Sequence, residues 1–163
     1  MSAQRNPRVL GASEGEFLGS AGVRDRFMID GADTGGRFAL VQHLFEPHAL
    51  AAPVHRHPAH DQYTYVLSGT VGFKLGECEV VAGPGDLVFK PRAQWNTFWN
   101  ATGEPASVLE IISPAGLEDA FREMGSLDHE PTIEELNAIA VSYGCEFDFE
   151  ATAVLIERHG LRF

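Results

Sequence analysis

Short apolar runs separated by glycine, proline and asparagine fill the chain from Arg26 to Ser113. Apolar and polar residues alternate within several of these runs, as in residues 62–68 (QYTYVLS) and 94–100 (QWNTFWN). This period of two is typical of half-buried β-strands, and regularly spaced turn residues are typical of a β-sandwich or barrel. Residues 68–70 (SGT) and 75–77 (LGE) have the composition of tight hairpin turns. The pattern therefore predicts an antiparallel all-β barrel over residues 26–113.

Beyond Ser113 the periodicity becomes that of helices. Ser113 has the position of a helix N-cap, Pro114 that of the first helical residue, and Gly125 that of the stop. Further along, Thr132 and Glu135 have the spacing of a capping box, in which each side chain accepts a hydrogen bond from the other residue's backbone N–H. Two helices are therefore expected, one ending at Gly125 and one beginning after Thr132.

These signals divide the chain into three parts. Residues 1–25 are polar and rich in glycine, and we expect an N-terminal segment that is partly irregular. Residues 26–113 form the barrel, and residues 114–163 form a helical extension that packs on it, with a third helix over 150–160 (EATAVLIERHG). The chain of 163 residues, of which 44% are hydrophobic, is long enough for one compact domain and hardly for two.

Charge and composition exclude several classes of partner. A formal net charge of −11 opposes a broad phosphate-binding surface, so we expect no nucleic-acid partner. No apolar run approaches the roughly 20 residues of a membrane span, and residues 1–16 lack the apolar core of a signal peptide. We therefore expect a cytoplasmic protein without a membrane partner. Cys78 and Cys145 lack CxxC spacing and are expected to be buried thiols, because a reducing compartment disfavours a disulfide.

Two histidines at alternating positions give the first chemical signal. On an extended segment the side chains of His55 and His57 point to the same face, so both can bind one ion. Neutral imidazole suits zinc, copper, iron and nickel, but a firm site needs three or four protein ligands. The remaining ligands must come from other parts of the chain.

The residues around these histidines resemble the first sequence motif of the cupin superfamily. That motif has the form His-x-His, then a glutamate after three or four residues, then a glycine after six more. In this sequence it corresponds to His55, His57, Gln62 and Gly69, with glutamine at the glutamate position.

The second cupin motif is matched by residues 83–100 (GPGDLVFKPRAQWNTFWN). Asn96 stands at the histidine position of this motif and Asn100 at its asparagine. The similarity covers roughly residues 37–125 and looks most like the small single-domain cupins described as quercetin-dioxygenase-like. It implies a jelly-roll-like β-barrel whose mouth holds the functional site.

The resemblance implies a metal site formed by His55, His57, Gln62 and Asn96. Cupins of this kind hold a divalent ion with three histidines and a glutamate, so Fe, Ni, Mn or Zn is the implied cofactor. Amide oxygens are weaker ligands for such ions, and metal binding is therefore expected to be weak or absent. Asp61 is an alternative ligand, because a bulge can turn it inward, although the register favours Gln62. Gln62 and Asn96 can equally well satisfy each other or a buried water.

The inner strand faces predict an apolar substrate pocket, formed by Val66, Phe73, Leu75, Phe98 and Ile112. With the resemblance, this predicts a small-molecule enzyme of the dioxygenase, isomerase or cyclase type. Its substrate is apolar and can be aromatic or polyketide-like, and His55 and His57 are the candidate catalytic residues. Two alternatives stay open: metal-free acid–base catalysis by the same polar cluster, and a ligand-binding or structural protein with a degenerate site.

The remaining aromatic and histidine side chains are assigned simpler roles. We assign Tyr63, Tyr65, Trp95 and Trp99 to outer-face packing or an oligomer surface. Large apolar groups on the outer face need a cover, and a homodimer is the hypothesis that supplies one. His60 is interpreted as a loop residue, and His43 shows no spacing that demands chemistry.

Overall fold

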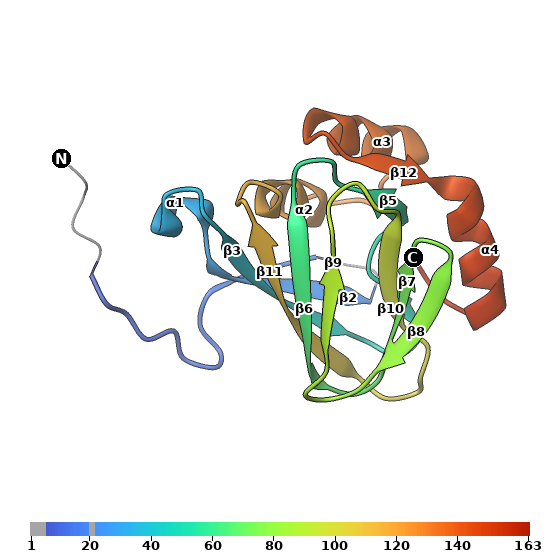
Figure 1. Cartoon of the computed structure of the whole chain (residues 1–163), viewed down its shortest axis with the longest axis horizontal. Coiled ribbons are helices and arrows are strands. Elements are labelled where there is room, and N and C mark those ends of the chain that lie inside the picture. Colours follow the sequence, from blue (N-terminus) through green and yellow to red (C-terminus); the bar gives the residue numbers. More distant parts are fainter. Residues whose placement is uncertain (1–5, 20–21) are drawn as a thin grey trace.

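The computed structural model describes residues 6–19 and 22–163, which form two antiparallel β-sheets with helices around them (Figure 1). Every pair of named strands in this part of the chain is antiparallel. The first sheet has the order β1 (Glu16–Leu18), β2 (Val23–Ile29), β3 (Ala39–Phe45), β11 (Ala106–Ser113), β6 (Asp61–Ser68), β9 (Leu87–Lys90). The second has the order β12 (Glu146–Asp148), β5 (Val54–Arg56), β10 (Asn96–Asn100), β7 (Val71–Leu75), β8 (Cys78–Ala82), with β4 (Ala49–Leu50) also paired to β10. The predicted antiparallel all-β fold is confirmed.

Four helices accompany the sheets in the described part of the chain: α1 (Gly31–Thr34), α2 (Glu118–Gly125), α3 (Ile133–Ser142) and α4 (Phe149–His159). Figure 1 shows α2 and α3 at one end of the barrel and α4 along its side. The capping box predicted at Thr132 is present, because its hydroxyl accepts the Glu135 N–H and its own N–H donates to the Glu135 carboxylate. None of the described helices is both long and apolar enough to cross a membrane.

The start of α2 differs from the sequence prediction. The helix begins at Glu118, whereas the sequence predicted Pro114 as its first residue. The Glu118 carboxylate accepts hydrogen bonds from the backbone N–H groups of Gly116 and Gly31, so the segment before the helix forms a turn. Three short strands, β1, β4 and β12, were not predicted, and β1 and the start of β2 lie within the segment expected to be partly irregular.

The side chains between the sheets follow the predicted alternation. In β6 the side chains of Gln62, Thr64 and Val66 are buried, while their neighbours are more exposed. Phe73 and Phe98 stack with their ring centroids 5.7 Å apart in the middle of this core. Burial of several large aromatic and aliphatic groups is the main stabilising contribution to such a barrel.

Helix α4 covers the outer face of the second sheet. Trp99 points outward from β10 but is only 3% exposed, because it packs against Leu50, Leu155 and Leu161. Its ring also stacks on His159 with the centroids 4.7 Å apart. The chain itself therefore provides the cover that Trp99 needs.

The outer face of the first sheet remains partly apolar and uncovered. On β6 and the edge strand β9 the exposed side chains include Tyr65, Leu67, Leu87 and Phe89. Tyr63 stacks on Phe89 with 5.0 Å between the ring centroids. The homodimer stays a prediction, and this face is the one that it would cover.

The two cysteines lie in different surroundings. Both are free thiols, and Cys145 is buried as expected. Cys78 is exposed, so the prediction of a buried thiol is wrong there. The reason is that β8 is an edge strand whose first four residues all face solvent.

Replacing Gly72 is expected to loosen the contact between β7 and Trp99. A Cβ atom at Gly72 would lie 2.4 Å from atoms of the indole ring. We expect Gly72→Ala to lower the free energy of unfolding by about 1–3 kcal/mol, as overpacking does elsewhere. Urea denaturation followed by tryptophan fluorescence measures this change. Gly103→Ala is the matched control, because nothing lies within 4 Å of a Cβ atom at that position; equal effects of the two variants would contradict the prediction.

Candidate active site

A cavity of about 550 Å³ enters the barrel between the two sheets, below α2 and the segment that follows it. Its polar lining inside the barrel consists of Asp25, His43, His55, Gln62 and Glu110. Its walls are mainly apolar, and its mouth is formed by residues 127–131 together with Phe163. A largely apolar cavity with a few converging polar groups is the usual form of a small-molecule site.

His43 lies at the centre of a buried array of charged groups. Its Nδ1 is 2.6 Å from Oδ1 of Asp25, and its Nε2 is 2.9 Å from Oε2 of Glu110. The strand register explains this geometry, since Asp25 is the direct partner of His43 on β2. Glu110 lies two residues along β11 from Val108, the partner of His43 on the other side, and therefore on the same face. Three neighbouring strands thus bring two carboxylates to one imidazole.

Lys90 completes the array from β9. Its ammonium group forms a buried ion pair with Oε1 of Glu110, and the Thr64 hydroxyl donates to the same oxygen over 3.0 Å. The ammonium also lies 4.2 Å from the ring centroid of Phe98, where a cation–π contact adds to the stabilisation. The Lys90 side chain is 0% exposed, so its charge depends entirely on these partners.

The charges of the array hold each other in their ionised forms. Burial lowers the pKa of His43, but the charges and hydrogen bonds of Asp25 and Glu110 outweigh it and raise the pKa to about 9. Burial raises the pKa of Glu110, but Lys90 and His43 together hold it well below its usual range. Burial lowers the pKa of Lys90, and the Glu110 carboxylate opposes this shift. The array therefore combines a His43 imidazole that is protonated at neutral pH with the buried ion pair of Lys90 and Glu110.

His55 and His57 form a second polar cluster, as the sequence predicts, with their ring centroids 4.6 Å apart. Nδ1 of His55 is 2.6 Å from the Pro53 carbonyl oxygen, which can only accept, so this nitrogen carries the proton and Nε2 has a free lone pair. Nδ1 of His57 is 2.9 Å from Sγ of Cys145. Asn96 is the direct strand partner of His55. Nε2 of His57 and Oδ1 of Asn96 are buried without a hydrogen-bond partner among the described residues.

These two histidines are neutral, in contrast to His43. Burial lowers the pKa of His55 to about 4, and the nearby Lys90 charge acts in the same direction. Burial also lowers the pKa of His57 well below its ordinary value, and His55 and Lys90 lower it further. One cavity is therefore lined by the positively charged imidazole of His43 and by the neutral imidazole of His55.

The donor set does not fit the transition-metal site that the resemblance implies. The two imidazoles are suitable donors, but the Gln62 and Asn96 positions offer only neutral amide oxygens. Asp61, the alternative ligand, is ion-paired with Arg92 at 2.7 Å on the outside of the barrel. Within the described part of the chain, no group of three or more His, Cys, Asp and Glu side chains is placed to hold a metal ion. The Lys90 ammonium, on the residue paired with Gln62, further opposes a second cation here.

The predicted pocket residues occupy different places. Phe98 lines the cavity. Val66, Phe73 and Ile112 are fully buried in the packed core and are not among the residues that line the cavity, and Leu75 is a half-buried residue beside that core. The assignment of these residues to a substrate pocket stays a prediction, because alternation only distinguishes inward from outward side chains and does not separate the packed core from the cavity lining.

His60 lies near the histidine cluster, with its ring centroid 6.4 Å from that of His57. It is not among the residues that line the cavity. A loop position beside the site agrees with its interpretation from the sequence.

Sequence reasoning missed the His43 array. His43, Lys90 and Glu110 are each charged or titratable residues at inward positions of strands that are otherwise apolar, in ALVQHLF, LVFK and ASVLEIIS. A charge on the buried face of a strand needs a partner, and this was the available signal. Asp25 carries no such signal, because its role follows only from its pairing with His43.

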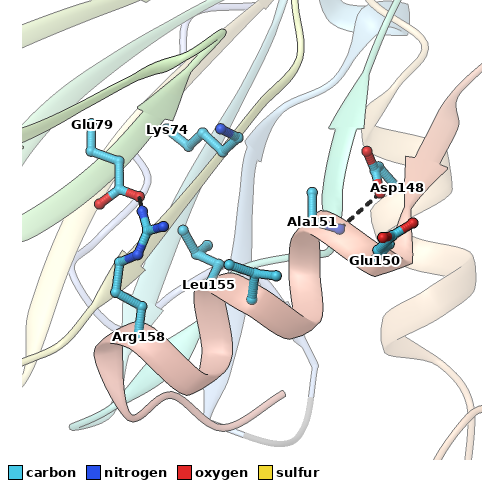
Figure 2. A pocket seen from close by; sticks show the side chains of 8 residues that line it. Lys74, Glu79, Asp148, Glu150, Ala151, Leu155 and Arg158 are labelled. Atoms are coloured by element: carbon cyan, nitrogen blue, oxygen red, sulfur yellow. Dashed lines mark hydrogen bonds and ion pairs between the residues drawn. The ribbon is translucent and has the colours of Figure 1, made fainter.

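A second depression lies outside the barrel, between α4 and strands β7 and β8 (Figure 2). Three of its charged side chains have local partners: Nη1 of Arg158 is 2.5 Å from Oε1 of Glu79, and the Asp148 carboxylate accepts the Ala151 N–H over 2.9 Å.

Comparison with known proteins identifies the fold independently. Residues 41–112 match the family described as the cupin domain. A search of curated proteins gives no significant match. The matches do not support the narrower quercetin-dioxygenase-like group.

Similar solved structures include enzymes with several activities. A sugar phosphate isomerase of the cupin superfamily from Silicibacter pomeroyi is 21% identical, with a TM-score of 0.57 over 65% of this chain and 75% of that chain. The polyketide cyclase RemF from Streptomyces resistomycificus is 23% identical, with a TM-score of 0.58 over 66% and 80% of the respective chains. The nucleoside dehydratase Pac13 from Streptomyces is 17% identical, with a TM-score of 0.56 over 70% and 88%. At these identities the likeness shows the fold alone.

The metal affinities of variants with and without Lys90 test whether its charge opposes metal binding. Gln62→Glu with Asn96→His supplies a carboxylate and an imidazole, yet we expect only a small gain in Ni²⁺ or Zn²⁺ affinity while Lys90 is present. Adding Lys90→Met should raise the affinity further by about a hundredfold, because a buried like charge is removed. Calorimetric titration measures these affinities, and circular dichroism checks that each variant is folded. Lys74→Met is the control, and a full gain with Lys90 intact would contradict the prediction.

Stability should fall as the pH rises from about 6.5 to about 9. In this range the folded protein keeps the His43 proton, because its pKa is about 9, whereas the unfolded chain loses it near the ordinary histidine pKa of 6.5. The stabilisation is complete below 6.5 and is lost as the pH passes 9, and it amounts to at most about 3 kcal/mol. Urea denaturation at several pH values measures the slope. His43→Gln should flatten it, and an unchanged slope in that variant would refute the assignment.

Proposed function

The barrel is a cupin domain, and from this premise we propose that the protein is a small-molecule enzyme that transfers protons, in the manner of an isomerase, a cyclase or a dehydratase. The observation that carries the proposal is that a neutral His55 and a protonated His43 line the same cavity. Environments that push the pKa values of two groups apart provide an acid and a base at the same pH.

His55 is the proposed base. Its hydrogen bond to the Pro53 carbonyl fixes the tautomer, so the lone pair of Nε2 is available to take a proton from a substrate C–H or O–H group. The residue lies on β5, whose pairing with β10 and β12 limits its movement. A base on a rigid strand keeps its orientation when the substrate binds.

His43 is the proposed source of the proton that returns to the substrate. It passes a proton across the 2.6 Å contact to Asp25, which also lines the cavity and can hydrogen-bond to a substrate oxygen. Glu110 and Lys90 keep the imidazole charged and oriented from the other side. Together the two histidines can remove a proton at one atom and deliver one at another, as isomerisation, cyclisation and loss of water require.

Proton transfer is favoured over the dioxygenase alternative. Oxygen insertion needs a redox cofactor, and the donor set beside His55 and His57 does not fit the metal that cupins use for it. The names of the similar cupin structures, an isomerase, a cyclase and a dehydratase, support chemistry of the first kind. The substrate is proposed to be a small apolar molecule, and the protein a homodimer that buries the exposed face of β6 and β9.

Loss of the His55 imidazole should abolish proton transfer without unfolding the barrel. We expect His55→Ala to reduce the rate by about 10²–10⁴-fold, the usual contribution of a general base. Deuterium uptake from D₂O into members of a panel of ketones, aromatic polyketide analogues and nucleosides, followed by mass spectrometry, detects the reaction. His60→Ala is the matched control and should leave both rate and melting temperature unchanged. Equal small losses in the two variants would favour the ligand-binding alternative.

A further inference from the structure

We propose that the cavity selects its ligand by charge, accepting an uncharged apolar molecule and rejecting phosphorylated or carboxylated ones, with Asp128 and Glu130 as specificity-determining residues at the mouth. The inference deepens the proposed function and depends on the same cavity. It follows from three separate observations on the interior, the walls and the mouth.

The charges inside the barrel are already balanced. Asp25 and Glu110 contribute two negative charges, and His43 and Lys90 contribute two positive ones, each held within an ion pair. No charge of this array is left to pair with an ionic ligand. A buried anion would therefore lose its hydration without gaining a counter-charge, which costs several kcal/mol.

The cavity walls inside the barrel offer no unpaired cation to an anion. Among the described residues that line the cavity there is no lysine or arginine, and both ring nitrogens of the protonated His43 are already bonded to Asp25 and Glu110. The Lys90 ammonium is ion-paired with the Glu110 carboxylate, and Lys90 is not among the residues that line the cavity. Recognition of phosphate or carboxylate relies on arginine, lysine or clustered backbone N–H groups. The apolar lining includes Leu50, Phe98, Phe121, Met124, Leu136 and Phe163.

The mouth adds a negative field that an anion must cross. Asp128 and Glu130 lie on the segment between α2 and α3 that borders the opening. Among the described residues of the mouth, the cationic candidate is His129, whose ring nitrogens lie 3.1 Å from Oδ1 of Asp128 and 3.0 Å from Oε1 of Glu135. Any positive charge on His129 is thus shared by two carboxylates. The charge at the entrance is negative, like the formal net charge of the whole chain, which is −11.

Two fluorescent probes that differ by one charge test the proposal. N-phenylnaphthylamine is uncharged, and anilinonaphthalene sulfonate is the same ring system with a sulfonate group. We expect the uncharged probe to bind more tightly by at least about tenfold. Met124→Trp, which fills the cavity, should weaken its binding and so show where it binds. Equal or tighter binding of the sulfonate, binding of neither probe, or binding unaffected by Met124→Trp would overturn the proposal.

Removing the negative charges at the mouth tests whether Asp128 and Glu130 cause the discrimination against the sulfonate probe. Asp128→Asn with Glu130→Gln should raise the affinity for the sulfonate several-fold and leave the uncharged probe unaffected. Glu150→Gln with Glu157→Gln is the matched control, because it removes the same charge from exposed positions on α4. An equal gain in both double variants would assign the selectivity to net charge and overturn the role of the mouth.

The binding experiment is independent of turnover. Selective binding of the uncharged probe by a protein that shows no His55-dependent deuterium uptake would refute the proposed function and keep the charge selection. Non-selective binding together with His55-dependent deuterium uptake would refute the charge selection and keep the proposed function.

Discussion

Burying the carboxylate of Glu110 in the middle of a β-barrel is costly unless several donors surround it. It is 1% exposed, and its donors come from three other strands: His43 on β3, Thr64 on β6 and Lys90 on β9. Glu110 itself lies on β11, which is hydrogen-bonded to β3 on one side and β6 on the other. One carboxylate therefore couples the register of four of the six strands in the first sheet. A register slip of one residue would turn this carboxylate away from all three donors.

The same constraint decides what the cavity can do. Lys90 and His43 can remain charged in the interior only because Glu110 and Asp25 accompany them. Burial lowers the pKa values of the neighbouring His55 and His57, and the Lys90 charge lowers them further, so both imidazoles are neutral. The replacement of the usual glutamate by Gln62 is consistent with this arrangement, since the positive charge near that position belongs to the protein itself.

Local patterns in the sequence predicted the fold better than the site. Alternation correctly predicted the inward facing of Gln62 and Val66, and the spacing of His55 and His57 correctly placed them side by side. These features depend on residues close together in the chain. The His43 array instead joins residues 25, 43, 90 and 110, and its geometry is set by strand pairing, which no single segment encodes. The helix start at Glu118 was missed for a similar reason, because one of its two backbone partners is Gly31.

The segment that follows α4 forms part of the cavity wall. The Arg162 backbone N–H donates to the His48 carbonyl, and the Arg162 carbonyl accepts the N–H of Leu50 in β4, so that Phe163 borders the cavity. The wall at Phe163 is therefore held by two backbone hydrogen bonds to a segment that is distant in the sequence. A substitution near His48, which does not itself line the cavity, would alter the cavity wall through this pairing.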